Sequence, residues 1–301
     1  MTSGGAPGAG ADRTFLLACD AFHARSYDSA ARLAGDAIAS GPATAGLHGL
    51  LAAALLAARR PVLAVGACDR ARALAPDVAW PWRLRAFALA EMRRGDEAVA
   101  SAESAVRLAP LDPWAHDVLA RSLAAAGRLA EARTAAREAV RLAPRDPDLV
   151  RRAGDTWVTD DPKAAEARYR EAIALDPTSA AGWDALAGAL TRQLRDEDAA
   201  AARKRAAALD PAFAERYRRQ RAFVPLLQLG AGLLLAIFAL SLAPRLVPPR
   251  AVKVTTAVLW VVVLLAPALF AIGAAVALQR GPRHPAPPDP QVAEVVSRLL
   301  T

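Results

Sequence analysis

Small apolar residues recur along most of this chain with a period of 34 residues. Six prolines mark the period, and alanine stands 24, 12 and 5 residues before each of them. The prolines, separated by 34, 34, 34, 33 and 34 residues, are Pro42, Pro76, Pro110, Pro144, Pro177 and Pro211. The alanines are Ala18, Ala52, Ala86, Ala120, Ala153 and Ala187; Ala30, Ala64, Ala98, Ala132, Ala165 and Ala199; and Ala37, Ala71, Ala105, Ala139, Ala172 and Ala206. A fixed period of this length is typical of a stacked array of structural repeats.

The period predicts two antiparallel helices in each repeat. Helices approach to about 8 Å where the side chains between them are small, so one alanine on the first helix and two on the second supply the contact. Proline then ends the second helix, as in the segment Leu74–Pro76, because it cannot continue a helix and restricts the residue before it. Residues typical of turns separate the two helices, as in Arg93–Asp96 and Ala125–Arg128.

Larger side chains complete the pattern of the first helix. An aromatic position holds Trp82 and Trp183, while His48, His116 and Thr14 stand at the corresponding places of other repeats. A large apolar position is filled by Leu55, Leu89, Leu123, Trp157 and Leu190. Together with the prolines and alanines, these positions resemble the tetratricopeptide repeat family.

The resemblance covers about two thirds of the chain and implies an all-α helical solenoid of six helix-turn-helix repeats. The repeats fall at 11–44, 45–78, 79–112, 113–146, 147–179 and 180–213. The fifth is one residue shorter, near Asp160–Pro162. Residues 1–10 are expected to be disordered. Residues 214–221 are expected to form a short capping and juxtamembrane helix, because a repeat array needs a polar cap at its end.

Two long segments near the C-terminus carry no charged residue. They span residues 222–244 and 254–279, and nine residues that include Pro248 and Pro249 separate them. About 20 apolar residues suffice to cross the hydrocarbon core of a bilayer. The sequence therefore predicts a transmembrane helical hairpin after the repeats.

The distribution of charge predicts how this hairpin is oriented. The chain has a net charge of +8, but residues 11–213 carry 28 basic and 27 acidic residues, so most of the excess lies at the membrane-flanking end. Nine basic residues flank the hairpin on the side of the two termini, against three in the turn. The positive-inside rule then predicts a multi-pass protein of the cell membrane with both termini cytoplasmic. Arginine outnumbers lysine 35 to 3, which indicates a bacterial source with a GC-rich genome.

The tail at residues 280–301 predicts a proline-rich spacer followed by a short amphipathic helix. Asp289 and Pro290 form a typical helix start, and apolar residues follow at helical spacing. They are Val292, Val295, Val296, Leu299 and Leu300. So short a helix is marginal alone in water, so it requires a surface. The lipid interface, a partner protein and the groove of the array are the candidates; an unfolded tail is the other interpretation.

The sequence offers no pattern of catalytic or ligating residues. Cys19 and Cys68 lie at helical positions without metal or redox spacing, and the four histidines have no ligand partner at the usual intervals. The acidic runs near Asp160 and Asp196 fall at turns, where acidic side chains favour helix N-termini. We therefore expect no enzymatic activity and no cofactor. The absence of a clustered basic face argues against nucleic acid as a partner.

Protein binding is the function that the resemblance implies. In tetratricopeptide arrays the first helices line a concave groove for peptides or helices. Carrying that register onto this chain gives nine candidate groove residues: Trp80, Arg83, Phe87, Trp114, Asp117, Arg121, Asp148, Arg151 and Asp155. Aromatic and arginine side chains are enriched among the residues that dominate protein interfaces.

Two functional hypotheses follow. In the first, the chain is a membrane-anchored adaptor or scaffold that recruits a protein or peptide partner to the cytoplasmic face of the membrane. In the second, it is a subunit of a membrane transport or secretion complex, in which the two spans are functional and the repeats dock partners. Association of several copies, through the spans or the array, is open in both.

Overall fold

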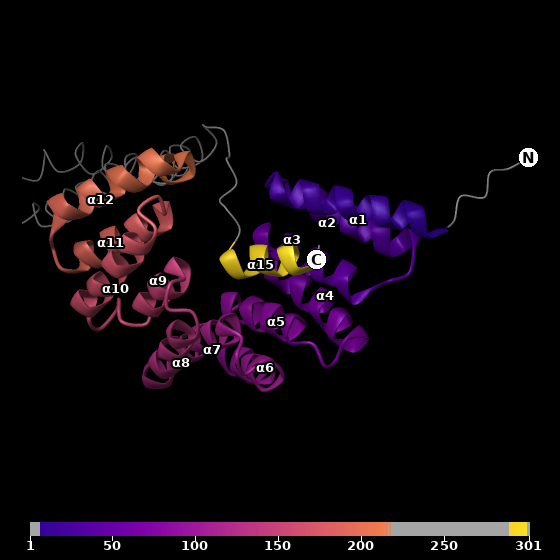
Figure 1. Cartoon of the computed structure of the whole chain (residues 1–301), viewed down its shortest axis with the longest axis horizontal. Helices are drawn as coiled ribbons and strands as arrows, with labels where there is room; N and C mark the ends of the chain where they lie inside the picture. The colour runs from indigo at the N-terminus through magenta and orange to yellow at the C-terminus, as the bar shows by residue number, and fades with distance from the viewer. Residues whose placement is uncertain (1–6, 216, 218–288, 300–301) are drawn as a thin grey trace, which may run out of the picture. The chain divides into compact units, whose positions relative to one another are not determined.

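The computed structural model describes residues 7–215, 217 and 289–299, and every regular element among them is a helix. Figure 1 shows the helices following one another in antiparallel pairs. The first helices of the pairs are α1 (Pro7–His23), α3 (Ala45–Ala57), α5 (Ala79–Glu91), α7 (Pro113–Ala125), α9 (Pro147–Asp155) and α11 (Ala180–Arg192). The second helices are α2 (Tyr27–Ser40), α4 (Pro61–Leu74), α6 (Gly95–Leu108), α8 (Leu129–Leu142), α10 (Pro162–Leu175) and α12 (Asp196–Leu209). A further helix, α15 (Pro290–Leu299), lies near the C-terminus.

Neighbouring repeats stack through both of their helices. From α1 to α11 each helix packs against the next one in the chain, and each first helix also contacts the first helix of the following repeat. The first helices therefore form one continuous surface, which we call the first-helix face and define by α1, α3, α5, α7, α9 and α11. The predicted all-α helical solenoid is confirmed.

The alanines of the period are the points of closest packing. All eighteen are buried, and none is more than 3% exposed. Because an alanine side chain is a single methyl group, the two helices of a pair and the adjoining repeats can approach without a gap. Each repeat proline stands two residues beyond the end of a second helix, which agrees with its predicted role as a stop signal.

The turn inside each pair repeats as regularly as the helices do. Five turn residues adopt a left-handed backbone with φ between 59° and 80°; they are Arg25, Arg59, Arg93, Gly127 and Leu194. In each case the N–H of the next residue donates to the carbonyl five residues earlier, at 2.8–3.0 Å. This is the Schellman arrangement, which satisfies a free carbonyl at the end of a helix. Four of the five residues are not glycine, so their backbone is strained.

The fifth repeat departs from this geometry at the place where it lacks one residue. Helix α9 has 9 residues, whereas α3, α5, α7 and α11 have 13 each. It ends at Asp155, and a series of turns carries the chain to α10. Arg133 of α8 donates to the Thr156 carbonyl at 3.3 Å and pairs with Asp160. The shortened repeat is thus held by a side chain of its neighbour.

The aromatic position of the first helix has a polar role as well as an apolar one. The indole N–H of Trp82 donates to the Pro76 carbonyl at 3.4 Å, and that of Trp183 donates to the Pro177 carbonyl at 3.1 Å. His116, at the equivalent position, brings Nε2 to 2.8 Å from the Pro110 carbonyl. A histidine ring nitrogen thus reaches the carbonyl that is equivalent to the acceptor of the tryptophan N–H in the other two repeats.

Several predicted segments lie outside the described residues. These are residues 1–6, both uncharged segments at 222–244 and 254–279, the turn between them, and the spacer that precedes α15. The prediction of disorder was wrong for residues 7–10, which form the first turn of α1. Residues 211–215 are helical, and the remainder of the predicted capping helix is described only at residue 217. Within the described ranges, no helix combines the length and apolar character needed to cross a membrane.

We predict that Leu194→Gly stabilises the array. Leu194 is 86% exposed and has φ 62°, so glycine relieves backbone strain without removing a packed side chain. We expect the free energy of unfolding to rise by about 0.5–1 kcal/mol, measured by denaturant unfolding of the full chain in detergent followed by circular dichroism. The matched control is Leu63→Gly, an exposed leucine inside α4, which should lower it by about 1 kcal/mol. A loss of stability in both variants would contradict the assignment of strain.

Candidate functional site

The tail helix α15 lies on the first-helix face. It packs mainly against α3, and Figure 1 shows it in yellow beside that helix. Val292, Val295 and Val296 are at most 1% exposed and belong to the same buried apolar cluster as Leu50 of α3 and Phe87 of α5. Their spacing of three and four residues places them on one stripe of α15. Burial of a valine side chain contributes about 1.5 kcal/mol or more, so this stripe is a substantial part of the contact.

Charged contacts follow the same surface beyond the apolar cluster. Three arginines of the first helices each bridge one carboxylate of the array and one carboxylate of the tail, which is Glu294 of α15 or Asp289, the residue that precedes α15. The arginines are Arg83 of α5, Arg121 of α7 and Arg152 of α9. We call these three side chains the arginine row.

Arg83 and Arg121 make their two contacts through separate nitrogens. Arg83 is 1% exposed; its Nη1 donates to Asp112 Oδ2 at 2.6 Å, and its Nη2 donates to Glu294 of α15. Arg121 donates from Nη2 to Glu91 Oε1 at 2.5 Å and from Nη1 to Asp289 Oδ2 at 3.1 Å. The Arg121 guanidinium also lies over the ring of Phe87, 4.3 Å from its centroid, in a cation–π contact.

Arg152 completes the row from the shortened fifth repeat. Its Nη1 lies 3.4 Å from Asp117 Oδ2, and its Nη2 donates to Asp289 Oδ1. Burial disfavours the charged form of this side chain, but Asp117 and Asp289 outweigh the effect and raise the pKa of the Arg152 guanidinium. The arginine therefore stays charged, and Asp289 accepts from two arginines at once.

The array carboxylates of the row join one repeat to the next. Asp112 is the N-cap of α7, where its Oδ1 accepts from the Trp114 N–H at 3.0 Å while its Oδ2 binds Arg83 of the preceding repeat. Glu91 stands at the end of α5 and binds Arg121 of α7. Each arginine is thus oriented by a neighbouring repeat as well as by α15, and this double support limits its rotamer freedom.

Two guanidinium nitrogens in the row are left without an acceptor. Arg83 Nε and Arg152 Nε are buried and make no hydrogen bond to any described residue. Both arginines bind their carboxylates one nitrogen at a time, although guanidinium groups are suited to two parallel bonds with one carboxylate. The row therefore retains unused hydrogen-bonding capacity.

The nine residues predicted from sequence divide into two groups in the structure. Arg83, Asp117 and Arg121 belong to the network around α15. The aromatic candidates lie beside it: Phe87 lies beneath Arg121, Trp114 has its ring 5.8 Å from the Arg152 guanidinium, and Trp80 packs against the apolar cluster.

The remaining three candidates form a second set on α9. Arg151 Nε lies 3.6 Å from Asp148 Oδ1, and Arg151 Nη1 lies 3.2 Å from Asp155 Oδ2. Asp155 also accepts from the Tyr169 hydroxyl at 2.7 Å. Burial raises the pKa of Asp148, and it raises the pKa of Tyr169 well above its ordinary value. Tyr169 and Asp155 thus link α9 to α10, which is a structural contact.

Sequence reasoning missed part of the site. The repeat register predicted Arg151 as a site residue, whereas the next residue, Arg152, joins the row. The prediction also omitted the four carboxylates Glu91, Asp112, Asp289 and Glu294. One signal was available, because Asp289 and Glu294 are the two acidic residues that follow Glu215 in the sequence. Both of them bind arginines of the first-helix face.

The two cysteines and His48 are buried among the packed helices. Cys19 and Cys68 are buried, and burial raises the pKa of the Cys19 thiol to about 11 and that of Cys68 still further. Burial, with a smaller effect of Arg70, lowers the pKa of His48. In the parts of the chain that are described, no three His, Cys, Asp or Glu side chains are grouped to hold a metal ion.

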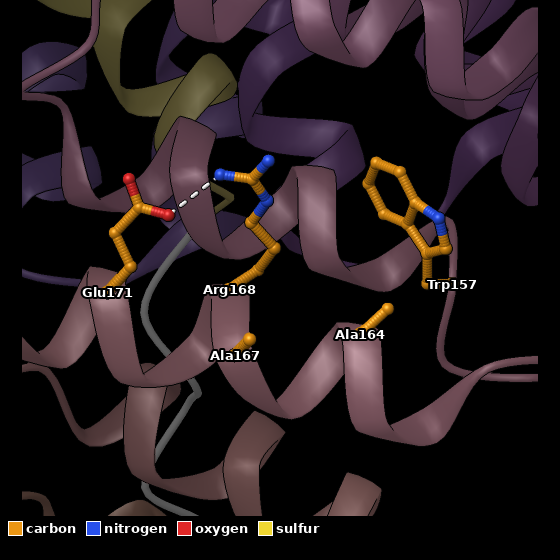
Figure 2. A pocket seen from close by; sticks show the side chains of 5 residues that line it. All are labelled: Trp157, Ala164, Ala167, Arg168 and Glu171. Atoms are coloured by element: carbon orange, nitrogen blue, oxygen red, sulfur yellow. Dashed lines mark hydrogen bonds and ion pairs between the residues drawn. The ribbon is translucent and has the colours of Figure 1, made fainter.

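A pocket of about 300 Å³ lies beside α10. Figure 2 shows its lining, with Arg168 Nη1 donating to Glu171 Oε2 at 2.8 Å. The lining residues are Trp157, Ala164, Ala167, Arg168 and Glu171. Arg168 and Glu171 form an exposed pair within one helix turn, and pairs of this kind contribute little energy. The first-helix face is the stronger candidate because its charged side chains are buried or half-buried and its contacts span four repeats.

Comparison with known proteins agrees with the repeat architecture. Two models of the tetratricopeptide repeat match, one over residues 15–79 and the other over residues 113–156. Among curated proteins, none is significantly similar to the chain.

Solved structures share the fold at low sequence identity. The thermophilic TPR protein TTC0263 of Thermus thermophilus is 18% identical, with a TM-score of 0.56 over 60% of this chain and 99% of its own. The pilF protein of Pseudomonas aeruginosa is also 18% identical, with a TM-score of 0.51 over 69% of this chain and 95% of its own. Residues 15–79 and 113–156 therefore match tetratricopeptide repeats, and the chain shares the fold of these two proteins.

We predict that Arg152→Ala strongly destabilises the chain. It removes a buried cation that two carboxylates share, and breaking a buried pair from one side costs about 3–5 kcal/mol. The matched control is Arg141→Ala, since Arg141 is 65% exposed and pairs with Glu138 on the surface of α8. That change should cost less than about 1 kcal/mol. Denaturant unfolding of both full-length variants tests the difference, and equal losses would show that the arginine row is not a buried network.

Proposed function

We propose that this tetratricopeptide-repeat chain is a membrane-anchored adaptor that recruits a protein partner on its first-helix face. The observation that carries the proposal is the contact with α15, in which this surface already binds an amphipathic helix. Apolar burial supplies part of the contact and the arginine row supplies the rest. A surface with this composition is suited to a helical segment of another protein.

The side chains of the site support protein recognition. Arg83 is buried at the surface that contacts α15, and Phe87 and Trp114 present aromatic rings to neighbouring arginines. Arginine and tryptophan are prominent among residues that carry interface energy. Since the carboxylates of the array already orient the arginines, little side-chain entropy is lost when a ligand binds. This role requires no cofactor and no catalytic step.

The anchoring part of the proposal is supported by the sequence between the array and α15. Residues 222–244 and 254–279 are uncharged and long enough to cross a bilayer. The packing of α15 on α3 supports a topology in which two crossings return the tail to the side of the array. The basic flanks favour the cytoplasmic side.

We predict that the uncharged segments hold the chain in the membrane. The full chain should remain with membranes after an alkaline carbonate wash, whereas a variant with residues 222–279 replaced by a Gly/Ser linker of equal length should be released. Fractionation and immunoblotting measure the difference. Release of the unaltered chain would contradict the proposal.

A second replacement tests the adaptor role against a function of the spans themselves. Substituting both segments by unrelated Leu/Ala helices of the same length should restore membrane association and the proteins that co-purify in mild detergent. If membrane association returns but the co-purified proteins do not, the spans take part in binding, as the hypothesis of a transport or secretion subunit requires.

We predict that the tail faces the cytoplasm. Ser297 is exposed on α15, while both native cysteines are buried, so Ser297→Cys introduces one accessible thiol. A membrane-impermeant maleimide should label it only after the cells are permeabilised. Arg250→Cys, in the predicted turn between the spans, is the matched control and should be labelled in intact cells. Labelling of Ser297→Cys in intact cells would reverse the orientation.

A further inference from the structure

We infer that α15 is an internal ligand of the first-helix face, and that the partner is an amphipathic helix with the same recognition pattern. The pattern has an acidic residue at the N-cap and a second acidic residue five positions later. Apolar β-branched residues follow the cap at the third, sixth and seventh positions, as Val292, Val295 and Val296 follow Asp289. The inference rests on the proposed function, because it names the partner and the regulation of the same site.

Charge complementarity supports the role of a ligand. The last 86 residues hold two carboxylates, Asp289 and Glu294, and both bind the arginine row. Glu294 of α15 pairs with Arg83, and Asp289, at the N-cap of α15, pairs with Arg121 and Arg152. The valine stripe meets the apolar cluster at the same time. A helix that merely covered an apolar patch would not need acidic residues matched to each arginine of the row.

Removal of α15 leaves each arginine of the row paired with a carboxylate of the array. Arg83 retains Asp112, Arg121 retains Glu91, and Arg152 retains Asp117 when the tail contacts are removed. Because an unpaired buried charge is strongly unfavourable, these three array carboxylates make an open first-helix face accessible. The row is therefore suited to exchange one acidic helix for another.

The contacts of α15 leave two hydrogen-bond donors of the arginine row unused, and a tighter-binding ligand would use them. Arg83 Nε and Arg152 Nε have no acceptor among the described residues, although both arginines are buried. A partner carboxylate that binds Nε and Nη2 together would use the planar fork of the guanidinium, which α15 does not. A partner with the same pattern and a better-placed carboxylate would displace the tail.

The link to the chain lets α15 act as an intramolecular competitor. A tethered segment competes at an effective concentration set by its link, so a free helix must overcome it. A helix of 10 residues is only marginally stable alone in water. The displaced tail therefore gains little free energy from helix formation to offset its lost contacts. Occupancy of the site then depends on the partner's affinity and concentration, and weak partners are excluded.

Binding of a labelled peptide that copies residues 286–301 tests the inference directly. The full chain, in detergent micelles, is compared with a chain that ends at Pro288 and with the tail variant Asp289→Asn/Glu294→Gln. We expect the peptide to bind the shortened chain at least tenfold more tightly than the full chain, with the tail variant in between. A peptide carrying the same two amide substitutions is the matched control and should bind the shortened chain at least tenfold more weakly.

Two outcomes would overturn the inference. Equal binding of the peptide to the full and shortened chains would show that α15 does not compete, and no binding to a shortened chain whose circular dichroism is unchanged would show that it is not a ligand. The tail variant keeps the valine stripe, so it provides the comparison if truncation disturbs folding. A dimer that becomes monomeric on truncation would instead place the tail on a second copy. These results do not depend on the membrane and co-purification tests, so either proposal can fail alone.

Discussion

The arrangement of the site depends on the neutralisation of three guanidinium groups, of which Arg83 and Arg152 are buried and Arg121 is half-buried. A charge removed from water is strongly unfavourable unless it is paired, so each arginine of the row binds carboxylates on two sides. One side is supplied by a neighbouring repeat and ties α5, α7 and α9 together. The other side is supplied by α15, which the row therefore holds in a defined register on the first-helix face.

This double pairing connects stability to recognition. The array carboxylates orient the arginines before any ligand arrives, and the apolar cluster beside them gives a helix a surface on which to bury its apolar stripe. The repeats are also held by the alanine contacts and the left-handed turns, which involve none of the site side chains. A change of ligand can consequently alter the contacts of the row while the solenoid stays intact.

Much of the fold could be predicted because its causes are local. Alanine spacing, the position of each repeat proline and the turn residues all act within a single repeat or between adjacent ones. Two details needed the structure. The Pro110 carbonyl accepts a hydrogen bond from His116, which occupies the position that tryptophan holds in other repeats. The missing residue of the fifth repeat shortens α9 rather than α10. That shortened helix is also the one on which Arg152, and not Arg151, joins the site.

The sequence by itself determined the number and length of the repeats, the amphipathic tail and the helices on which the candidate groove residues stand, because each follows from a periodic pattern. Only the tertiary structure decided which surface the tail covers and which charges pair. The ion pairs of α15 join residues 137, 168 and 211 positions apart. Spacing along the chain carries no record of such contacts, since they arise when stacked repeats bring three arginines into one row that matches two carboxylates.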